Sequence, residues 1–229
     1  VGTSAGSLVG ALWAAGYTGL QIEEIALKVK DADIIDLASL SKRGLVGGEQ
    51  IEQLVNQLAK NRRIEQLPIK FASVATILRT GEMAIMQDGD LGFAVRASCS
   101  IPGVFLPAKR GDTEYLDGGL VSPMAVKVAR QLGADVVVAV DVNSSNISVT
   151  PQGIFEQIMH SFDIMGRALS RLESEHADIV VKPDMSRIAS TDFGSRAGSI
   201  QLGLFAGQRL APVIIEKMVQ LNNKRIRGK

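Results

Sequence analysis

The segment VGTSAGSLVGALWAAGY, residues 1–17, decides the fold because it joins a glycine-flanked serine to an apolar helix-like run. Gly2 and Gly6 enclose Ser4 in a G-x-S-x-G pattern, and small or apolar residues dominate the turns that follow. Glycines relieve crowding where a strand reverses sharply into a helix, so the pattern predicts a strand-to-helix elbow with an exposed serine hydroxyl. A glycine-rich turn with an incidental serine is the alternative.

On the elbow interpretation, Ser4 is a nucleophile and the helix after it supplies electrostatic stabilisation. A helix begins with N–H groups that lack intrahelical partners and with the positive end of its dipole. The backbone N–H of Ala5 is therefore a candidate donor to the negative oxygen of an acyl-transfer intermediate.

A serine hydroxyl needs a base to take its proton, and the chain offers two kinds of candidate. His160 and His176 fall in or beside a long predicted helix, where packed or surface histidines are typical. Asp117, in YLDGGL, ends a short strand, and Gly118 and Gly119 after it let the backbone approach another group closely. An aspartate in a partly dry pocket can act as a general base. An ordinary Asp-Gly turn is the alternative.

Strands alternate with helices along the chain, which predicts an α/β fold. The run DVVVAVDV, residues 135–142, is apolar at its centre, as in strands buried within a parallel sheet. The turn RTGE, residues 79–82, predicts a hairpin, and Asp90 is predicted to cap a helix. Because no repeat or linker-like segment interrupts the chain, we expect residues 1–229 to form a single domain around a mainly parallel central sheet.

The composition argues against several classes of protein. Lys and Arg number 25 and Asp and Glu 24, a formal net charge of +1, so no nucleic-acid partner is expected. With one cysteine and no zinc-like Cys/His spacing, we expect no disulfide, no metal site and no cofactor. No apolar run approaches the roughly 20 residues of a membrane-spanning helix. We expect a cytoplasmic protein or one peripheral to the membrane.

Together these residues resemble the patatin-like phospholipase family, and within it the bacterial branch related to neuropathy target esterase. GTSAG and DGG match the family's G-x-S-x-G and D-G-[AG] motifs, and AVRASCSIPGVFLPA and LGADVVVAVDV are similar to its other segments. The resemblance implies a three-layer fold in which Ser4 is the nucleophile and Asp117 the general base. The motif glycines are then Gly2, Gly6, Gly118 and Gly119.

The resemblance also implies an activity. It is that of a serine lipid acyl hydrolase, which cleaves fatty-acyl esters of phospholipids or lysophospholipids through an acyl-serine intermediate and without a cofactor. The expected partners are a lipid or acyl-ester substrate and a peripheral contact with a membrane surface. Two alternatives stay open: an esterase or thioesterase for small soluble acyl groups, and a low-turnover regulatory binding protein that keeps the fold.

The family carries a glycine-rich oxyanion loop upstream of the elbow. Because the chain starts one residue before the elbow, we expect residues 1–229 to be an N-terminally incomplete domain. A central strand without its neighbours leaves buried backbone groups unpaired. We therefore expect this piece alone to fold poorly and to be inactive.

Further residues suggest contacts with a lipid, each beside a plainer alternative. Arg79 and Arg96 are candidates for a phosphate contact, although solvated or ion-paired arginines are more common. Cys99 is expected to be a buried, small hydrophobic residue. Four apolar residues are candidates for a lipid-facing wall, with core packing the favoured alternative: Ile101, Val104, Phe105 and Leu106.

Overall fold

Strand β2 (Ser73–Ile77) is central to the larger sheet of this computed structural model. Its first four residues are buried, so small and β-branched side chains fill both of its faces. Strand β3 (Met83–Met86) runs antiparallel along one edge of β2. The other edge is shared by β1 (Gly2–Thr3), which is parallel to β2, and β5 (Thr113–Asp117), which is antiparallel. Strand β4 (Ala108–Arg110) pairs antiparallel with β5.

The structure describes residues 1–29, 47–143, 151, 153–186, 188 and 193–227. The chain divides into two compact units, Val1–Ala125 and Val126–Lys229, and the five-stranded sheet lies in the first. The single domain expected over residues 1–229 stays a prediction.

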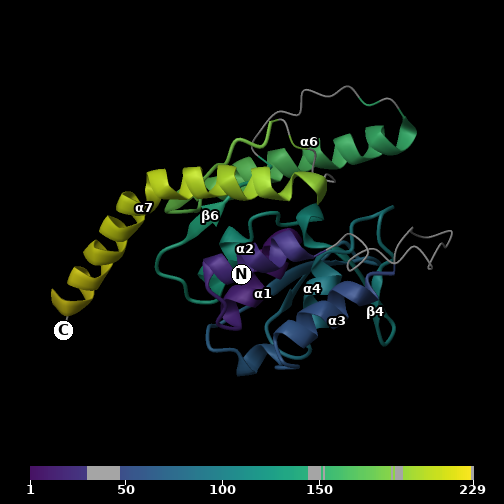
Figure 1. Cartoon of the computed structure of the whole chain (residues 1–229), viewed down its shortest axis with the longest axis horizontal. Coiled ribbons are helices and arrows are strands. Elements are labelled where there is room, and N and C mark those ends of the chain that lie inside the picture. The colour runs from purple at the N-terminus through teal and green to yellow at the C-terminus, as the bar shows by residue number, and fades with distance from the viewer. Residues whose placement is uncertain (30–46, 144–150, 152, 187, 189–192, 228–229) are drawn as a thin grey trace. The chain divides into compact units, whose positions relative to one another are not determined.

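Helices of the first unit pack on one another and on the sheet. Helix α3 (Glu49–Leu58) contacts α4 (Leu91–Ser98), and α1 (Ala5–Ala14) contacts both of them (Figure 1). Helix α4 also packs on β2. The buried cluster between these elements includes Ala11, Val55, Leu91, Val95 and Phe105. The helical segments of this unit are α1 (Ala5–Ala14), α2 (Gly19–Lys28), α3 (Glu49–Leu58), α4 (Leu91–Ser98) and the short turns η3 (Ile64–Gln66) and η4 (Gly118–Leu120).

Side-chain caps fix where two of these helices begin. Thr18 starts α2 with a capping box, in which its hydroxyl accepts from the Gln21 N–H and the Gln21 side chain accepts from the Thr18 N–H. Asp90 caps α4 by accepting a 2.6 Å hydrogen bond from the Phe93 N–H. The predicted cap at Asp90 is confirmed.

The second unit has its own small sheet, in which β6 (Val138–Val140) pairs in parallel with β7 (Ile179–Val181). Its longest helix, α7, contains Pro212 and changes direction in Figure 1, as expected where proline removes a helical hydrogen bond. The elements are α5 (Val126–Gln131), β6 (Val138–Val140), α6 (Ile154–Ser174), β7 (Ile179–Val181), η5 (Phe193–Ser195) and α7 (Arg196–Arg227).

The α/β class is confirmed, but the larger sheet is mixed rather than mainly parallel. Within the described part of the chain, β1–β2 is its one parallel pair, and the pairs β2–β3, β2–β5 and β4–β5 are antiparallel. Strands joined by a tight turn must run in opposite directions, as the predicted hairpin β2–β3 and the close pair β4–β5 do. The apolar run that suggested a parallel sheet forms β6, and β6 does pair in parallel.

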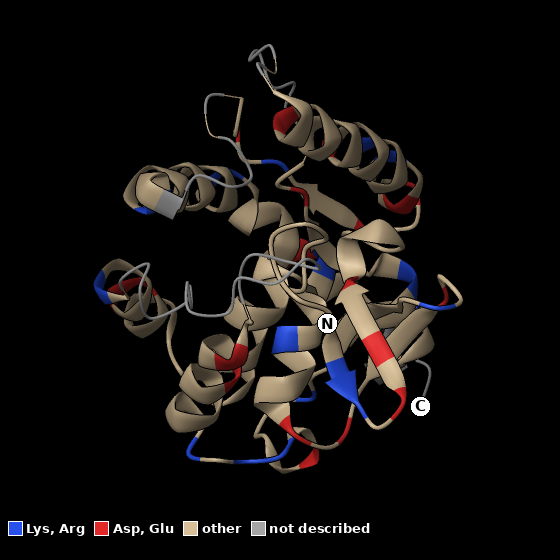
Figure 2. Cartoon of the chain, turned by 90° about the vertical axis from the view of Figure 1, so that its right-hand side faces the viewer, with Lys and Arg blue, Asp and Glu red and all other residues tan. Residues whose placement is uncertain are grey.

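Lys and Arg on the one hand and Asp and Glu on the other are interspersed over the chain, as Figure 2 shows, which fits the near-zero net charge. Among the described residues, no helix is both long enough and apolar enough to cross a bilayer.

Candidate active site

The candidate site lies where β1 and β5 end against the same edge of β2. Thr3, the last residue of β1, is registered with Val74, and Asp117, the last residue of β5, is registered with Ala75. The two strands approach from opposite directions and stop at consecutive positions of β2. Ser4, which directly follows β1, is thereby brought next to Asp117 although the two are far apart in sequence.

Ser4 adopts the strained backbone conformation of a sharp turn. Its φ is 53° and its ψ is −128°, a combination that side-chain-bearing residues rarely adopt. A Cβ on Gly2 would lie 2.4 Å from the Gly6 carbonyl oxygen, so only glycine allows β1 and α1 to approach this closely. By contrast, a Cβ on Gly6 would meet no described atom within 4 Å. The predicted strand-to-helix elbow is therefore present, and Gly2 is the glycine that it requires sterically.

The Ser4 hydroxyl donates a 2.6 Å hydrogen bond to Oδ2 of Asp117. The other carboxylate oxygen, Oδ1, accepts from the Gly119 N–H at 2.7 Å. Burial raises the pKa of Asp117 to about 6, and the hydrogen bonds from Ser4 and Gly119 oppose this rise. A carboxylate of this basicity, already bonded to a hydroxyl, is suited to take that hydroxyl's proton near neutral pH.

The two glycines after Asp117 differ in what they require. A Cβ on Gly118 would lie 2.1 Å from the Val74 carbonyl oxygen, so the chain passes too close to β2 for any side chain at this position. A Cβ on Gly119 would lie 3.0 Å from Oδ1 of Asp117, which is tight against the carboxylate. The DGG segment thus holds Asp117 against β2 because both following residues lack side chains.

Ala5 is the first residue of α1, so its N–H has no intrahelical acceptor. Ala5 is also exposed, and it directly follows Ser4 in the chain. This position at the positive end of the helix suits an N–H that would stabilise a developing negative oxygen.

The other candidate bases belong to the second unit. His160 lies within α6, and His176 is exposed just after that helix. The Ser4 hydroxyl proton is directed at Asp117 instead. Among the described residues, no three His, Cys, Asp or Glu side chains gather as a metal site.

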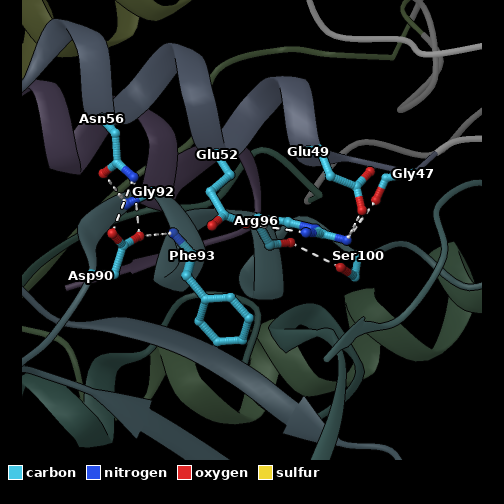
Figure 3. A network of polar contacts seen from close by, with 9 residues as sticks. All are labelled: Gly47, Glu49, Glu52, Asn56, Asp90, Gly92, Phe93, Arg96 and Ser100. Atoms are coloured by element: carbon cyan, nitrogen blue, oxygen red, sulfur yellow. Dashed lines mark hydrogen bonds and ion pairs between the residues drawn. The ribbon is translucent and has the colours of Figure 1, made fainter. Parts of the chain in front are cut away.

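Arg96 forms ion pairs instead of being a free cation for a phosphate. Its guanidinium contacts Glu49 at 2.6 Å and Glu52 at 3.1 Å, and it donates to the Gly47 carbonyl oxygen (Figure 3). The ion-paired alternative is therefore confirmed for Arg96, while Arg79 is exposed within the turn between β2 and β3.

The four apolar candidates for a lipid-facing wall are buried or partly buried. Phe105 belongs to the buried core, and Ile101 and Val104 pack against that core. Leu106 is partly buried. Cys99 is buried near the Ser7 hydroxyl, and burial raises the pKa of its thiol to about 12, so the thiol is protonated at neutral pH.

Several hydroxyl groups around the site have partners that the sequence did not suggest. The Ser98 Oγ accepts from the Ser4 N–H at 2.8 Å, and the Thr76 hydroxyl donates to the Asp117 carbonyl oxygen at 2.8 Å. The Thr3 hydroxyl donates to the Ser122 carbonyl oxygen. The sequence does contain a signal for these bonds: the hydroxyl-bearing residues stand in otherwise apolar segments, and a buried hydroxyl needs a hydrogen-bond partner.

The chain is similar in sequence to known proteins, including a family model and several relatives. The family model for patatin-like phospholipase matches residues 1–130. An uncharacterised NTE family protein of Mycobacterium tuberculosis is 26% identical over 90% of this chain and 40% of its own length. A second one, from Mycobacterium bovis, is 34% identical over 63% of this chain and 40% of its own length. Patatin-like phospholipase domain-containing protein 7 of Rattus norvegicus is 32% identical over 62% of this chain and 11% of its own. The chain spans about 40% of the length of the mycobacterial relatives.

Proposed function

The chain belongs to the patatin-like phospholipase family, and on that premise we propose that it is a serine lipid acyl hydrolase with a Ser4–Asp117 dyad. The proposed substrates are fatty-acyl esters of phospholipids or lysophospholipids. One observation carries the proposal: the 2.6 Å hydrogen bond from the Ser4 hydroxyl to a buried Asp117 carboxylate of raised pKa.

The proposed reaction has two halves. In the first, Asp117 accepts the Ser4 proton while Oγ attacks the ester carbonyl, and the tetrahedral intermediate collapses with loss of the alcohol, which takes up a proton from Asp117. In the second, Asp117 accepts a proton from water, the water oxygen attacks the acyl-serine, and the fatty acid leaves as Ser4 regains its proton. The Ala5 N–H donates to the negative oxygen in both tetrahedral intermediates.

Phospholipid substrates reside in a bilayer, so the proposal includes a peripheral contact between this protein and a membrane surface. Catalysis in a lipid-exposed site requires that the nucleophile be accessible and the base be dry. Ser4 is only partly buried, whereas Asp117 is buried, which agrees with that division.

The test is to treat the intact protein with a fluorophosphonate probe and to identify the labelled residue by mass spectrometry. We expect the label on Ser4, its absence in Ser4→Ala, and a rate reduced by about 1000-fold in Asp117→Asn, since the base is lost. The labelling rate should rise with pH through about 6 and level off above it, because only ionised Asp117 accepts a proton.

Substrate chain length then distinguishes the lipid hydrolase from its alternatives. Hydrolysis of long-chain phospholipid or lysophospholipid esters in preference to short soluble esters supports the proposal. Preference for short esters or thioesters would replace it with the small-substrate esterase. A folded protein whose Ser4 does not react with the probe would favour the low-turnover binding role.

A further inference from the structure

We infer that Ser98 is a positioning residue for the nucleophile, because its buried hydroxyl connects the Ser4 backbone to the central strand. The inference rests on the proposed function, and it adds a residue that acts through Ser4 without touching substrate. Ser98 is the last residue of α4 and is 0% exposed. Its Oγ accepts from the Ser4 N–H at 2.8 Å and donates to the Val74 carbonyl oxygen at 2.6 Å.

The hydroxyl occupies the place of one missing rung in the β1–β2 ladder. The Gly2 N–H donates to the Ala72 carbonyl oxygen at 2.9 Å, as a parallel pair requires. Hydrogen bonds in a parallel ladder recur every second residue, so the next rung would join the Ser4 N–H to the Val74 carbonyl oxygen. Here both groups bind the Ser98 hydroxyl instead. The inserted hydroxyl satisfies them while holding Ser4 further from β2 than a direct rung would.

The direction of these bonds makes Ser98 specific for this role. A serine hydroxyl has one proton, and the proton goes to the Val74 carbonyl oxygen, which leaves a lone pair to accept from the Ser4 N–H. An alanine at this position would leave a buried carbonyl and a backbone N–H without their partner. The turn at Ser4 is strained, so losing this bond removes one of the contacts that fix its conformation.

The same end of α4 also holds the base. The Ser100 carbonyl oxygen accepts from the Asp117 N–H at 2.9 Å, so the segment Ser98–Ser100 binds the backbones of both dyad members. The Ser100 hydroxyl in turn donates to the Arg96 carbonyl oxygen at 2.9 Å (Figure 3). The ion pairs of Arg96 to α3 therefore support the segment that sets the geometry between Ser4 and Asp117.

Ser73→Ala is a matched control for Ser98→Ala. The Ser73 hydroxyl is also 0% exposed, and it donates to a backbone carbonyl between the same two elements, that of Ala94 at 2.9 Å. Both variants lose a fully buried hydroxyl at the β2–α4 contact. Only Ser98→Ala removes the partner of the Ser4 N–H. A difference between the variants therefore reports on positioning and not on the general cost of losing a buried hydroxyl.

The experiment measures the fluorophosphonate labelling rate of Ser4 against pH in the intact wild-type protein and both variants. We expect Ser98→Ala to lower the plateau rate about 10- to 100-fold, since misplacing a reacting atom by about 1 Å can cost 100-fold. We also expect its pH midpoint to move upward, because the Ser4 hydroxyl bond opposes the raised pKa of Asp117. Ser73→Ala should keep the wild-type midpoint and a rate within about threefold. Equal rates and midpoints in the two variants would overturn the inference.

Amide hydrogen exchange tests the same contact without relying on activity. The Ser4 N–H should be protected in the wild-type protein and in Ser73→Ala, and should exchange faster in Ser98→Ala. An unprotected Ser4 amide in the wild-type protein would overturn the inference even if Ser98→Ala failed to fold. If the wild-type protein did not label at all, the proposed function would fail, whereas selective loss of Ser4 protection in Ser98→Ala would still support the positioning role.

Discussion

The elbow at Gly2–Gly6 and the turn at Asp117–Gly119 both reverse the chain beside β2, but they hold their functional side chains by different means. Ser4 is partly buried and sits at a φ of 53°, so the constraint on it lies in its backbone. Asp117 has an ordinary backbone conformation, with a φ of −50° and a ψ of 135°. Its constraint lies in the side chain, which is buried and has a raised pKa.

The two regions are therefore destabilised in different ways, one by backbone strain and the other by the burial of a charged group. At the elbow, the strained backbone conformation of Ser4 holds its hydroxyl at a fixed and partly exposed position. The turn accepts the desolvation of a carboxylate, which raises its basicity. Substitutions at the elbow should therefore relieve or increase conformational strain, whereas substitutions at Asp117 should change how stability depends on pH.

The largest effect is expected at Gly118, which lies against the Val74 carbonyl group of β2. In Gly118→Ala the new Cβ would overlap the Val74 carbonyl oxygen at 2.1 Å, and a backbone atom of a central strand cannot move aside. We expect a loss of several kcal/mol in the free energy of unfolding, or failure to fold. Gly6→Ala meets no described atom within 4 Å and adds a better helix former, so its stability should be unchanged or slightly higher.

Thermal unfolding of the two glycine variants beside the wild-type protein checks this prediction. A Gly118→Ala protein as stable as wild type would mean that the turn has room to shift away from β2. The difference in unfolding free energy between Gly118→Ala and Gly6→Ala would then be smaller than the 2.1 Å approach of Gly118 to Val74 implies.

Asp117→Asn should raise stability while it removes the base. The pKa of Asp117 is about 6 in the folded protein against 3.8 for an ordinary aspartate, so the folded state binds a proton more tightly than the unfolded state does. Stability from this group therefore falls as pH rises from about 4 to about 6, and the cost is fully present above that window. Asparagine removes this cost, which is at most about 3 kcal/mol.

Urea unfolding at pH 4 and pH 7.5 measures this effect. We expect Asp117→Asn to be more stable than wild type at pH 7.5, and the difference to shrink toward zero at pH 4. An equal stability difference between Asp117→Asn and wild type at pH 4 and pH 7.5 would show that the carboxylate is not desolvated in the folded protein. Burial of a charge would then not distinguish the turn from the elbow.

Local sequence features predicted the elbow, the hairpin and the cap at Asp90, because each depends on residues close together in the chain. The nearness of Ser4 to Asp117 came from a family resemblance, since no local pattern states that β1 and β5 end at neighbouring positions of β2. The antiparallel hairpin β2–β3 was predicted from its local turn, but the antiparallel pairing of β2 with β5 joins strands far apart in the chain and was not. The expectation of a mainly parallel central sheet was therefore wrong.

The role of Ser98 was beyond sequence reasoning for a further physical reason. Its hydroxyl joins three segments, namely α4, the elbow and β2, and a serine in ASCSIP has many possible partners until all three are placed. Gly6 was grouped with Gly2 by the motif, although only Gly2 lacks room for a side chain. Motif membership thus predicts chemistry better than it predicts which residue is required sterically.

The smallest expected effect isolates the strain at the elbow itself. Ser4→Gly and Ser4→Ala both remove the hydroxyl, and the Ser4 side chain makes no capping bond to α1. They differ in that glycine accepts a positive φ without steric cost, whereas alanine does not. We expect Ser4→Gly to be more stable than Ser4→Ala by about 1–2 kcal/mol in urea unfolding at pH 7.5. Equal stability would mean that the elbow relaxes once the hydroxyl is gone, so that the bond to Asp117, and not the fold around Gly2, maintains the strained conformation.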